Sequence, residues 1–451
     1  MSPDPPSLSA VITDRQQLVE YFRRGAKAPE DRGIGTEHEK FVFRRKDARM
    51  LSFEEPGGFG DLLEELMAQF DWQPAPLDGG RLVSVVRDGQ SITLEPGGQF
   101  ELSGAVCRTV FETAREFDTH LEELRKLAGH RLLFAIWGIN PGVTLDDVPW
   151  MPKGRYHIMR RYLPTRGKLA HWMMKTTCTV QANFDYCSEA DAVDLIHTAV
   201  LISPVVGALF ANSPIQAGKP TGFQSRRNFI WWHHTDPDRT GVPSFMYRRD
   251  WGFEDYVEYA LDVPMFFIER QGELVDMAGH SFRRFIDEGH KGHQATMGDF
   301  ELHLSTLFPD VRLKQFVEVR SADGGPRDSV LALPALWKGI LYDDQARSQA
   351  TALFHPFTEA SHRELVTICY EDGIHGQSSF GPVIDLAKEL VDISLRGLDR
   401  IAADGDHRSE AEFLTPLEEI LDNQTSLADR LLEDFQELGE APGKLAERWQ
   451  L

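Results

Sequence analysis

Four short segments of this chain alternate polar and apolar side chains with the two-residue period of a β-strand. In such a strand the polar residues share one face and the apolar residues share the other. We expect the four segments to join one antiparallel sheet, with the apolar side on the core and the polar side forming a concave surface. The segments are GIGTEHEKFVF (33–43), SITLEPGGQFELSGA (91–105), KTTCTVQANFDYC (175–187) and LKQFVEVRSADGG (313–325).

The polar faces of these segments carry carboxylates. Glu37 and Glu39 point the same way, about 7 Å apart in an extended strand, and Phe41 and Phe43 continue that face as an apolar floor. A lone pair of this kind also fits an exposed edge strand whose glutamates are merely solvated. The acidic pattern recurs, however, which favours a shared surface. Its other members are Glu95 and Glu101, on either side of Pro96-Gly97-Gly98, and Glu318, which shares a face with Arg320.

Carboxylates gathered on one surface repel one another, since two charges 4 Å apart interact by about 4 kcal/mol at an effective dielectric of 20. A divalent cation between them removes this repulsion. Ligands that are all oxygen atoms favour Mg²⁺, with Mn²⁺ as the alternative, and disfavour zinc. We therefore predict a metal site that binds the phosphates of a nucleotide, although the chain has no P-loop motif.

One segment is basic in a chain that is otherwise acidic. Residues 151–175, MPKGRYHIMRRYLPTRGKLAHWMMK, contain Lys and Arg but no acidic residue, whereas the whole chain has a formal net charge of -22. One interpretation is that these side chains are internal partners for the acidic excess. The other is that they clamp phosphate groups opposite the metal.

A second candidate for anion binding is GFQSRRNFIWWHHTDPDRTG, residues 222–241. Arg226 and Arg227 are followed there by Trp231 and Trp232. A planar guanidinium beside aromatic walls suits the carboxylate of an amino acid. The sequence leaves open which arginine has this role.

Charge and hydropathy exclude two classes of protein. With 48 Lys and Arg against 70 Asp and Glu, the chain lacks the basic surface of a nucleic-acid binder. The N-terminus does not resemble a signal peptide, and we expect no apolar run that approaches the roughly 20 residues needed to span a membrane. Four cysteines without paired or metal-ligand spacing fit a reducing compartment. We predict a cytoplasmic protein that binds neither nucleic acid nor membranes.

An ordered series of motifs runs from about residue 33 to 345. It consists of GIGTEHEKF, LEPGGQFELSGA, MPKGRYHIM, CTVQANFD, ANSPI..GKPTGFQSRRNFIW, DRTG, YALDVPM, HLSTLFPDVRLKQFVEVRSADGG and ALPALWKGILYD. Together these motifs resemble the plant and proteobacterial type of glutamate-cysteine ligase. The resemblance implies an α+β, glutamine-synthetase-like fold, in which an antiparallel β-sheet forms a funnel with helices packed outside.

The resemblance also implies a reaction and its partners. ATP, L-glutamate and L-cysteine would give γ-glutamylcysteine, ADP and phosphate, the first step of glutathione synthesis, with Mg²⁺ as cofactor and ATP as co-substrate. The partners would be these small molecules, and the protein would be a monomer or a homodimer. We expect residues 1–32 to form a tail and one helix, residues 33–380 the catalytic domain, and residues 381–451 a helical cap packed on that domain.

Roles for individual residues follow from the same resemblance. Arg320 would stabilise the transferred phosphoryl group. Arg227, with Trp231 or Trp232 beside it, would bind the glutamate α-carboxylate, while Gln181 and Asn183 would hydrogen-bond a substrate. Lys153 and Arg155 would contact nucleotide phosphates. The predicted Mg²⁺ ligands are Glu37, Glu39, Glu95, Glu101 and Glu318.

The chain departs from the family pattern at several positions. Phe266 stands where the family has a tyrosine, which removes a hydroxyl that could have touched a substrate. The regulatory cysteines of the plant enzymes fall on Ala114, Met277 and Leu331, so we do not expect redox control. Two alternative functions stay open at this point: a related ligase with another amine acceptor, and a non-catalytic relative that binds nucleotide.

Overall fold

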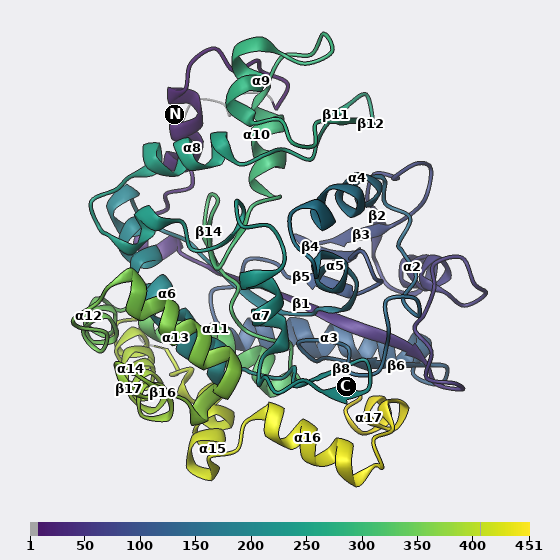
Figure 1. The fold of residues 1–451 in the computed structure, drawn as a ribbon, viewed down its shortest axis with the longest axis vertical. Helices are drawn as coiled ribbons and strands as arrows, with labels where there is room; N and C mark the ends of the chain where they lie inside the picture. Colours follow the sequence, from purple (N-terminus) through teal and green to yellow (C-terminus); the bar gives the residue numbers. More distant parts are fainter. Residues whose placement is uncertain (1–7, 406) are drawn as a thin grey trace.

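The computed structural model describes residues 8–405 and 407–451, and its main element is one nine-stranded antiparallel sheet (Figure 1). The predicted α+β class is therefore confirmed. The strands are β1 (Ile34–Arg44), β2 (Gln73–Pro74), β3 (Ser84–Arg87), β4 (Gln90–Leu94), β5 (Phe100–Ser103), β6 (Leu132–Ala135), β7 (Val180–Phe184), β14 (Val311–Leu313) and β15 (Val317–Val319). Their order is β14-β15-β7-β1-β5-β4-β3-β2, and β6 pairs with the far half of β1.

The four alternating segments lie side by side in this sheet, as predicted. On one side of β1, Glu37 is opposite Gln181 of β7, and on the other side Glu39 is opposite Glu101 of β5. On the next strand, Glu318 is opposite Asn183. The register therefore brings the polar faces of distant segments onto one side of the sheet.

Helices cover the opposite face of the sheet. His38, which alternates with Glu37 and Glu39, packs at a tilt against Phe117 of α3 (Val110–Ala128), with ring centroids 4.6 Å apart. The apolar residues of β7 pack in the same core as α6 (Glu189–Leu209) and α11 (Arg327–Leu341). This arrangement leaves the acidic face of the sheet free to form a site.

Helix α6 corrects one expectation from the sequence. It is long and apolar enough to cross a membrane by length and composition, although no apolar run of that size was predicted. Within the fold, 94% of the window that passes this test is buried. Helix α6 is therefore the central core helix of this protein, apolar on all sides because protein surrounds it.

The remaining helices surround the sheet. Figure 1 shows α8 to α10 at the top of the molecule and the C-terminal helices α14 to α17 at the bottom. Helix α14 packs on α11 and α17 packs on β6. These helices are α1 (Gln16–Arg23), α2 (Phe59–Gln69), α4 (Gly154–Tyr162), α5 (Ala170–Thr176), α7 (Arg226–His233), α8 (Phe253–Asp262), α9 (Phe282–Glu288), α10 (Met297–Leu304), α12 (Asp344–Ala352), α13 (Glu359–Asp372), α14 (Val383–Asp404), α15 (Thr415–Asn423), α16 (Leu427–Glu437) and α17 (Pro442–Arg448).

Four short strand pairs complete the described structure. One of them, the parallel pair β10–β13, joins the segment after α7 to the segment before β14 and so places both beside the polar face of the sheet. The pairs are β8 (Ile215–Gln216) with β9 (Lys219–Pro220), β10 (Thr240–Gly241) with β13 (Phe308–Pro309), β11 (Phe267–Arg270) with β12 (Glu273–Asp276), and β16 (Gln377–Ser378) with β17 (Gly381–Pro382).

Candidate active site

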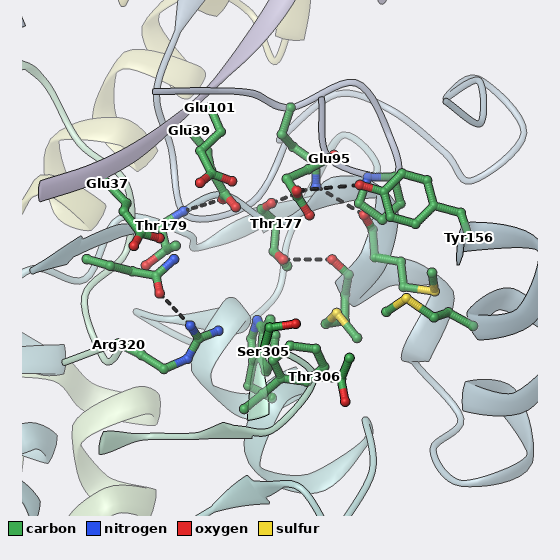
Figure 2. A pocket seen from close by; sticks show the side chains of 18 of the residues that line it. Glu37, Glu39, Glu95, Glu101, Tyr156, Thr177, Thr179, Ser305, Thr306 and Arg320 are labelled. Atoms are coloured by element: carbon green, nitrogen blue, oxygen red, sulfur yellow. Dashed lines mark hydrogen bonds between the residues drawn. The ribbon is translucent and has the colours of Figure 1, made fainter. Parts of the chain in front are cut away.

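A pocket of about 200 Å³ opens on the polar face of the sheet. Figure 2 shows the carboxylates along one side of it and Arg320, Ser305 and Thr306 along the other. The acidic lining residues are Glu37, Glu39, Glu95 and Glu101, and the basic ones are Arg155, Arg227, Arg312 and Arg320. The apolar wall consists of Met159, Met173, Met174, Trp231, Phe267 and Phe308.

Each of the four carboxylates has a polar partner, and that of Glu95 is the weakest, because the Tyr156 hydroxyl donates mainly to the Leu94 carbonyl oxygen at 2.8 Å. Glu39 Oε2 accepts from the backbone N–H of Thr179 at 2.8 Å, and the backbone N–H of Glu39 donates to the Thr179 carbonyl oxygen at 3.2 Å. The other three bonds run to side chains: Asn183 Nδ2 to Glu37 Oε1 at 2.9 Å, Ser103 Oγ to Glu101 Oε1 at 2.7 Å, and Tyr156 Oη to Glu95 Oε1 at 3.4 Å.

The negative charge of this group is poorly compensated. Burial raises the pKa of Glu39 well above its ordinary value, and the carboxylates of Glu101 and Glu95 raise it further. Burial and the neighbouring charges of Glu95 and Glu37 likewise raise the pKa of Glu101 to about 7. A cation bound among these groups would relieve both effects.

The donor set suits a hard cation such as Mg²⁺. Within the described ranges, no three side chains of His, Cys, Asp or Glu converge closely enough to hold a metal ion by themselves. Mg²⁺ commonly uses only one or two protein carboxylates and completes its coordination with water and substrate phosphates. One or two of the four pocket carboxylates, with water and phosphate oxygens, therefore fit each Mg²⁺ ion.

Glu318 faces the same side of the sheet but does not line the pocket. Its fully buried carboxylate receives Arg312 Nη2 at 2.6 Å and Arg312 Nε at 3.0 Å, and it also contacts Arg320. Burial alone would raise the pKa of Glu318, but the charges of Arg312, Lys314 and Arg320 hold it well below its ordinary value. Glu318 stays a predicted metal ligand, one that would have to exchange Arg312 for the metal.

Arg320, which the sequence predicts to stabilise the transferred phosphoryl group, lines the pocket. Its Nη1 donates to Gln181 Oε1 at 2.5 Å, and its guanidinium carbon lies 5.7 Å from the ring centroids of both Trp231 and Phe308. The cation is thereby aimed into the pocket across from the carboxylates (Figure 2).

The structure distinguishes the two adjacent arginines of α7. Consecutive helical residues point about 100° apart, so only one of them can face the pocket. Arg227 does so, with 3% of its side chain exposed and its guanidinium 5.7 Å from the ring of Trp231. Arg226 lies outside the pocket, where its Nε donates to Gln216 Oε1 at 2.8 Å.

The structure also distinguishes the two tryptophans of α7, of which only one lines the pocket. Trp231 lines the pocket, whereas Trp232 lies outside it and donates through Nε1 to Asp310 Oδ2 at 2.8 Å. Of the two predicted amides, Gln181 lines the pocket, while Asn183 reaches it only through its bond to Glu37.

The structure divides the basic segment between the pocket and acidic partners elsewhere. Arg155 lines the pocket, and its Nη2 lies 3.5 Å from Glu95 Oε1. Lys153 is buried behind the lining, where burial and the charge of Arg155 lower its pKa to about 8. Other members are internal or surface partners of acidic residues: Arg161 pairs with Asp276 at 2.7 Å, and Arg166 pairs with Asp236 at 3.3 Å.

Two expectations about aromatic residues are wrong. Phe41 and Phe43 do not form the floor of the pocket, because the far half of β1 pairs with β6 and its side chains pack around Trp137. Phe266 does not face the pocket either. It is buried beneath the guanidinium of Arg239, 3.9 Å from its ring centroid, and its neighbour Phe267 lines the pocket instead.

Several lining residues were not predicted from the sequence. The methionines of the apolar wall lie within the basic segment, where charge alone drew attention to the pattern. Gln99 shares a strand face with Glu101, and this alternation could have identified it. Arg312 pairs with Glu318 across two strands, a contact that no local pattern reveals. The remaining unpredicted polar residues are Tyr156, Thr177, Thr179, Ser305 and Thr306.

An antiparallel sheet that holds four carboxylates opposite four guanidiniums defines an enzyme that gathers several anions in one pocket, as ATP-dependent carboxylate-amine ligases do. Within this class the chain belongs to the glutamate-cysteine ligase family 2, which it matches over residues 33–448. This membership confirms the family and the ligase activity predicted from the sequence.

Named relatives and a solved structure agree with this result. The chain is 38% identical over 439 residues to the chloroplastic glutamate-cysteine ligase of Brassica juncea, covering 96% of this chain and 84% of the relative. It is 39% identical over 437 residues to the Nicotiana tabacum enzyme, covering 95% and 82%. The crystal structure of a glutamate-cysteine ligase from Francisella tularensis in complex with AMP shares the fold, with a TM-score of 0.60, 12% identity and coverage of 93% and 87%.

The predicted cytoplasmic location is contradicted by these relatives. The plant enzymes to which the chain is similar are named as chloroplastic, and this finding overturns the prediction. An acidic composition and unpaired cysteines indicate a reducing aqueous compartment, and they do not distinguish one such compartment from another.

Proposed function

We propose that this pocket joins the γ-carboxylate of L-glutamate to the amine of L-cysteine at the expense of ATP, the first step of glutathione synthesis. The observation that carries the proposal is the facing of carboxylates and guanidiniums across one pocket. A γ-carboxylate oxygen would attack the terminal phosphorus of ATP, giving γ-glutamyl phosphate and ADP. The cysteine amine would then attack the acyl carbon, form the amide bond and displace phosphate.

Each charged group of the pocket has a role in this scheme. Glu37, Glu39, Glu95 and Glu101 would hold Mg²⁺, or Mn²⁺, and Glu318 would join them if it released Arg312. The metal would supply positive charge to the β- and γ-phosphates when bound.

The remaining roles belong to the cationic and amide side chains. Arg320 would stabilise the charge on the phosphoryl group as it moves between oxygens. Arg227 would bind the α-carboxylate of glutamate with Trp231 as one wall, and Gln181 would hydrogen-bond a substrate. Arg155, with Lys153 behind it, would contact nucleotide phosphates.

A phosphate-release assay tests the proposal. Purified protein with Mg-ATP should release phosphate slowly with glutamate alone and much faster when cysteine is added, with γ-glutamylcysteine as product. Faster release with a non-thiol amine than with cysteine would indicate a ligase with another acceptor. Nucleotide binding without any release would indicate a non-catalytic relative and contradict the proposal.

We also expect dithiol reductants and mild oxidants to change the ligase activity by no more than about twofold. All four cysteines are free, and burial raises the pKa of each thiol, that of Cys107 to about 11. Activity and mobility on non-reducing gels, before and after oxidation, check this expectation. A reversible change in activity that disappears when two cysteines are replaced by serine would contradict it.

A further inference from the structure

The two arginines assigned to the substrates come from different parts of the chain. Arg227 lies in the first turn of α7, and Arg320 follows β15. Their guanidiniums line the same pocket, so their relative placement decides where two anionic groups can bind. Between their backbones lies Asp323, whose side chain is fully buried.

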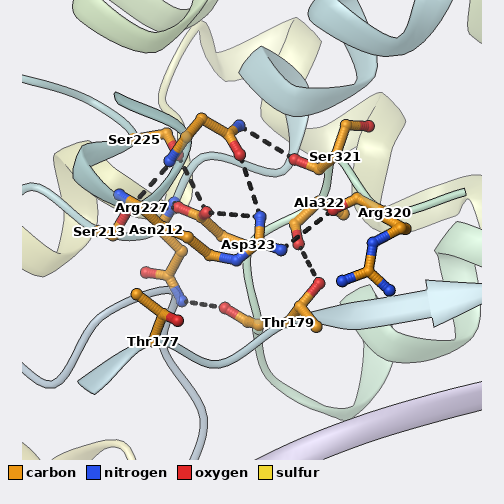
Figure 3. A network of polar contacts seen from close by, with 12 residues as sticks. Thr177, Thr179, Asn212, Ser213, Ser225, Arg227, Arg320, Ser321, Ala322 and Asp323 are labelled. Atoms are coloured by element: carbon orange, nitrogen blue, oxygen red, sulfur yellow. Dashed lines mark hydrogen bonds and ion pairs between the residues drawn. The ribbon is translucent and has the colours of Figure 1, made fainter. Parts of the chain in front are cut away.

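Neutral donors surround the carboxylate of Asp323 (Figure 3). Its Oδ2 accepts from the backbone N–H of Asn212 at 2.8 Å and from Ser213 Oγ at 2.6 Å, and its Oδ1 accepts from Ser225 Oγ at 2.9 Å. The Asp323 side chain is tightly packed against Gly138, where an added Cβ atom would lie 2.2 Å from Asp323 Cγ. Its position is therefore tightly defined.

The same contacts fix the first turn of α7. Ser225 caps this helix by accepting from the Asn228 N–H at 3.2 Å, and Ser213 Oγ accepts from the Arg227 N–H at 3.1 Å. The guanidinium of Arg227 also faces the carboxylate, with Nη1 at 3.9 Å from Asp323 Oδ1. Asp323 thus holds both the backbone and the charge of Arg227.

A second set of bonds joins α7 to the loop that carries Arg320. Arg227 Nη2 donates to the carbonyl oxygen of Arg320 at 3.0 Å, and Asn228 Nδ2 donates to that of Ser321 at 3.0 Å. Thr179 Oγ1 ties the next residue of the loop, Ala322, to the sheet at 2.8 Å. These bonds therefore set the spacing between the two pocket arginines.

We propose that Asp323 is a positioning residue, which orients Arg227 toward the glutamate α-carboxylate and sets its spacing from Arg320. This inference rests on the proposed function of Arg227. It assigns Asp323 no contact with a substrate, since Asp323 does not line the pocket. The expected signature is a defect in glutamate binding with ATP binding preserved.

The test compares Asp323→Asn with Asp236→Asn. Asp236 is also fully buried and pairs with Arg239 at 2.7 Å, but it does not line the pocket or contact a residue that does. We expect D323N to raise the glutamate KM by about 10- to 100-fold, with the ATP KM within about twofold, because small misplacements of binding groups have effects of this size. D236N should lower Tm and leave the glutamate KM near the wild-type value.

Two further variants keep the test decisive if D323N does not fold. Ser225→Ala removes one donor to Asp323 and preserves its charge, so the glutamate KM should rise by a smaller factor, about threefold. An unchanged glutamate KM in S225A and D323N, or an equal rise in D236N, would overturn the inference. Arg227→Lys distinguishes a failure of the proposed function from a failure of this inference. If R227K leaves the glutamate KM unchanged, Arg227 does not bind the glutamate carboxylate and the proposed site is wrong. If R227K raises the glutamate KM and D323N and S225A do not, only the positioning role of Asp323 is wrong.

Discussion

Replacing Glu39 by glutamine should lower kcat by at least about 100-fold and raise the Mg²⁺ concentration needed for half-maximal activity. The amide keeps the size of the side chain and can still accept the Thr179 N–H, so the fold should survive. It removes one negative charge from the group in which neighbouring carboxylates already raise the pKa of Glu39. Steady-state rates measured over a range of Mg²⁺ concentrations check this result.

Glu116→Gln is the matched control for this variant. Glu116 resembles Glu39 in that burial raises its pKa, here to about 7, and in that it accepts one backbone N–H, from Ala105 at 2.8 Å. It lies on α3, outside the pocket. We expect E116Q to keep the wild-type rate and Mg²⁺ dependence. Near-normal activity of E39Q at ordinary Mg²⁺ would show that the metal assignment is wrong.

Replacing Arg227 by lysine should raise the KM for glutamate by about 10- to 100-fold and change the KM for ATP little. Lysine keeps the positive charge but loses the planar fork that binds a carboxylate through two bonds. It also loses the contacts that Arg227 makes with Asn228 Oδ1 and with the carbonyl oxygen of Arg320, both at 3.0 Å. Initial rates with glutamate and ATP varied separately measure both constants.

Arg226→Lys is the natural control, because Arg226 precedes Arg227 on the same helix but points out of the pocket toward Gln216. Its effect on the glutamate KM should stay within about threefold, the range of a surface change. Equal effects of the two substitutions, or an effect on ATP alone, would contradict the assignment of Arg227.

The acidic face of the site could be predicted because it depends on local geometry. Residues two apart in a strand share a face, so Glu37 and Glu39 were placed together without knowledge of their neighbours. The turn at Pro96-Gly97-Gly98 likewise predicted that β4 and β5 would pair, as they do. The ordered motifs identified the family, and the family identified the reaction.

Predictions from local geometry failed where strand β1 changes its pairing partner. Phe41 and Phe43 continue the face of Glu37 and Glu39 in an ideal strand, but β1 leaves the β5 and β7 pairing and continues against β6. Their side chains therefore enter a different apolar cluster, around Trp137. Strand pairing is a long-range property, and no pattern within one segment reports it.

By itself, then, the sequence determined the fold class, the family and most of the charged residues of the site, since these follow from periodicity and from motifs read in order. The tertiary structure alone decided which members of that set share the pocket. It selected Arg227 over Arg226 and Trp231 over Trp232, and it paired Glu318 with Arg312. The physical reason is that these choices depend on the rotation of one helix and on contacts between distant strands, which only the packed core defines.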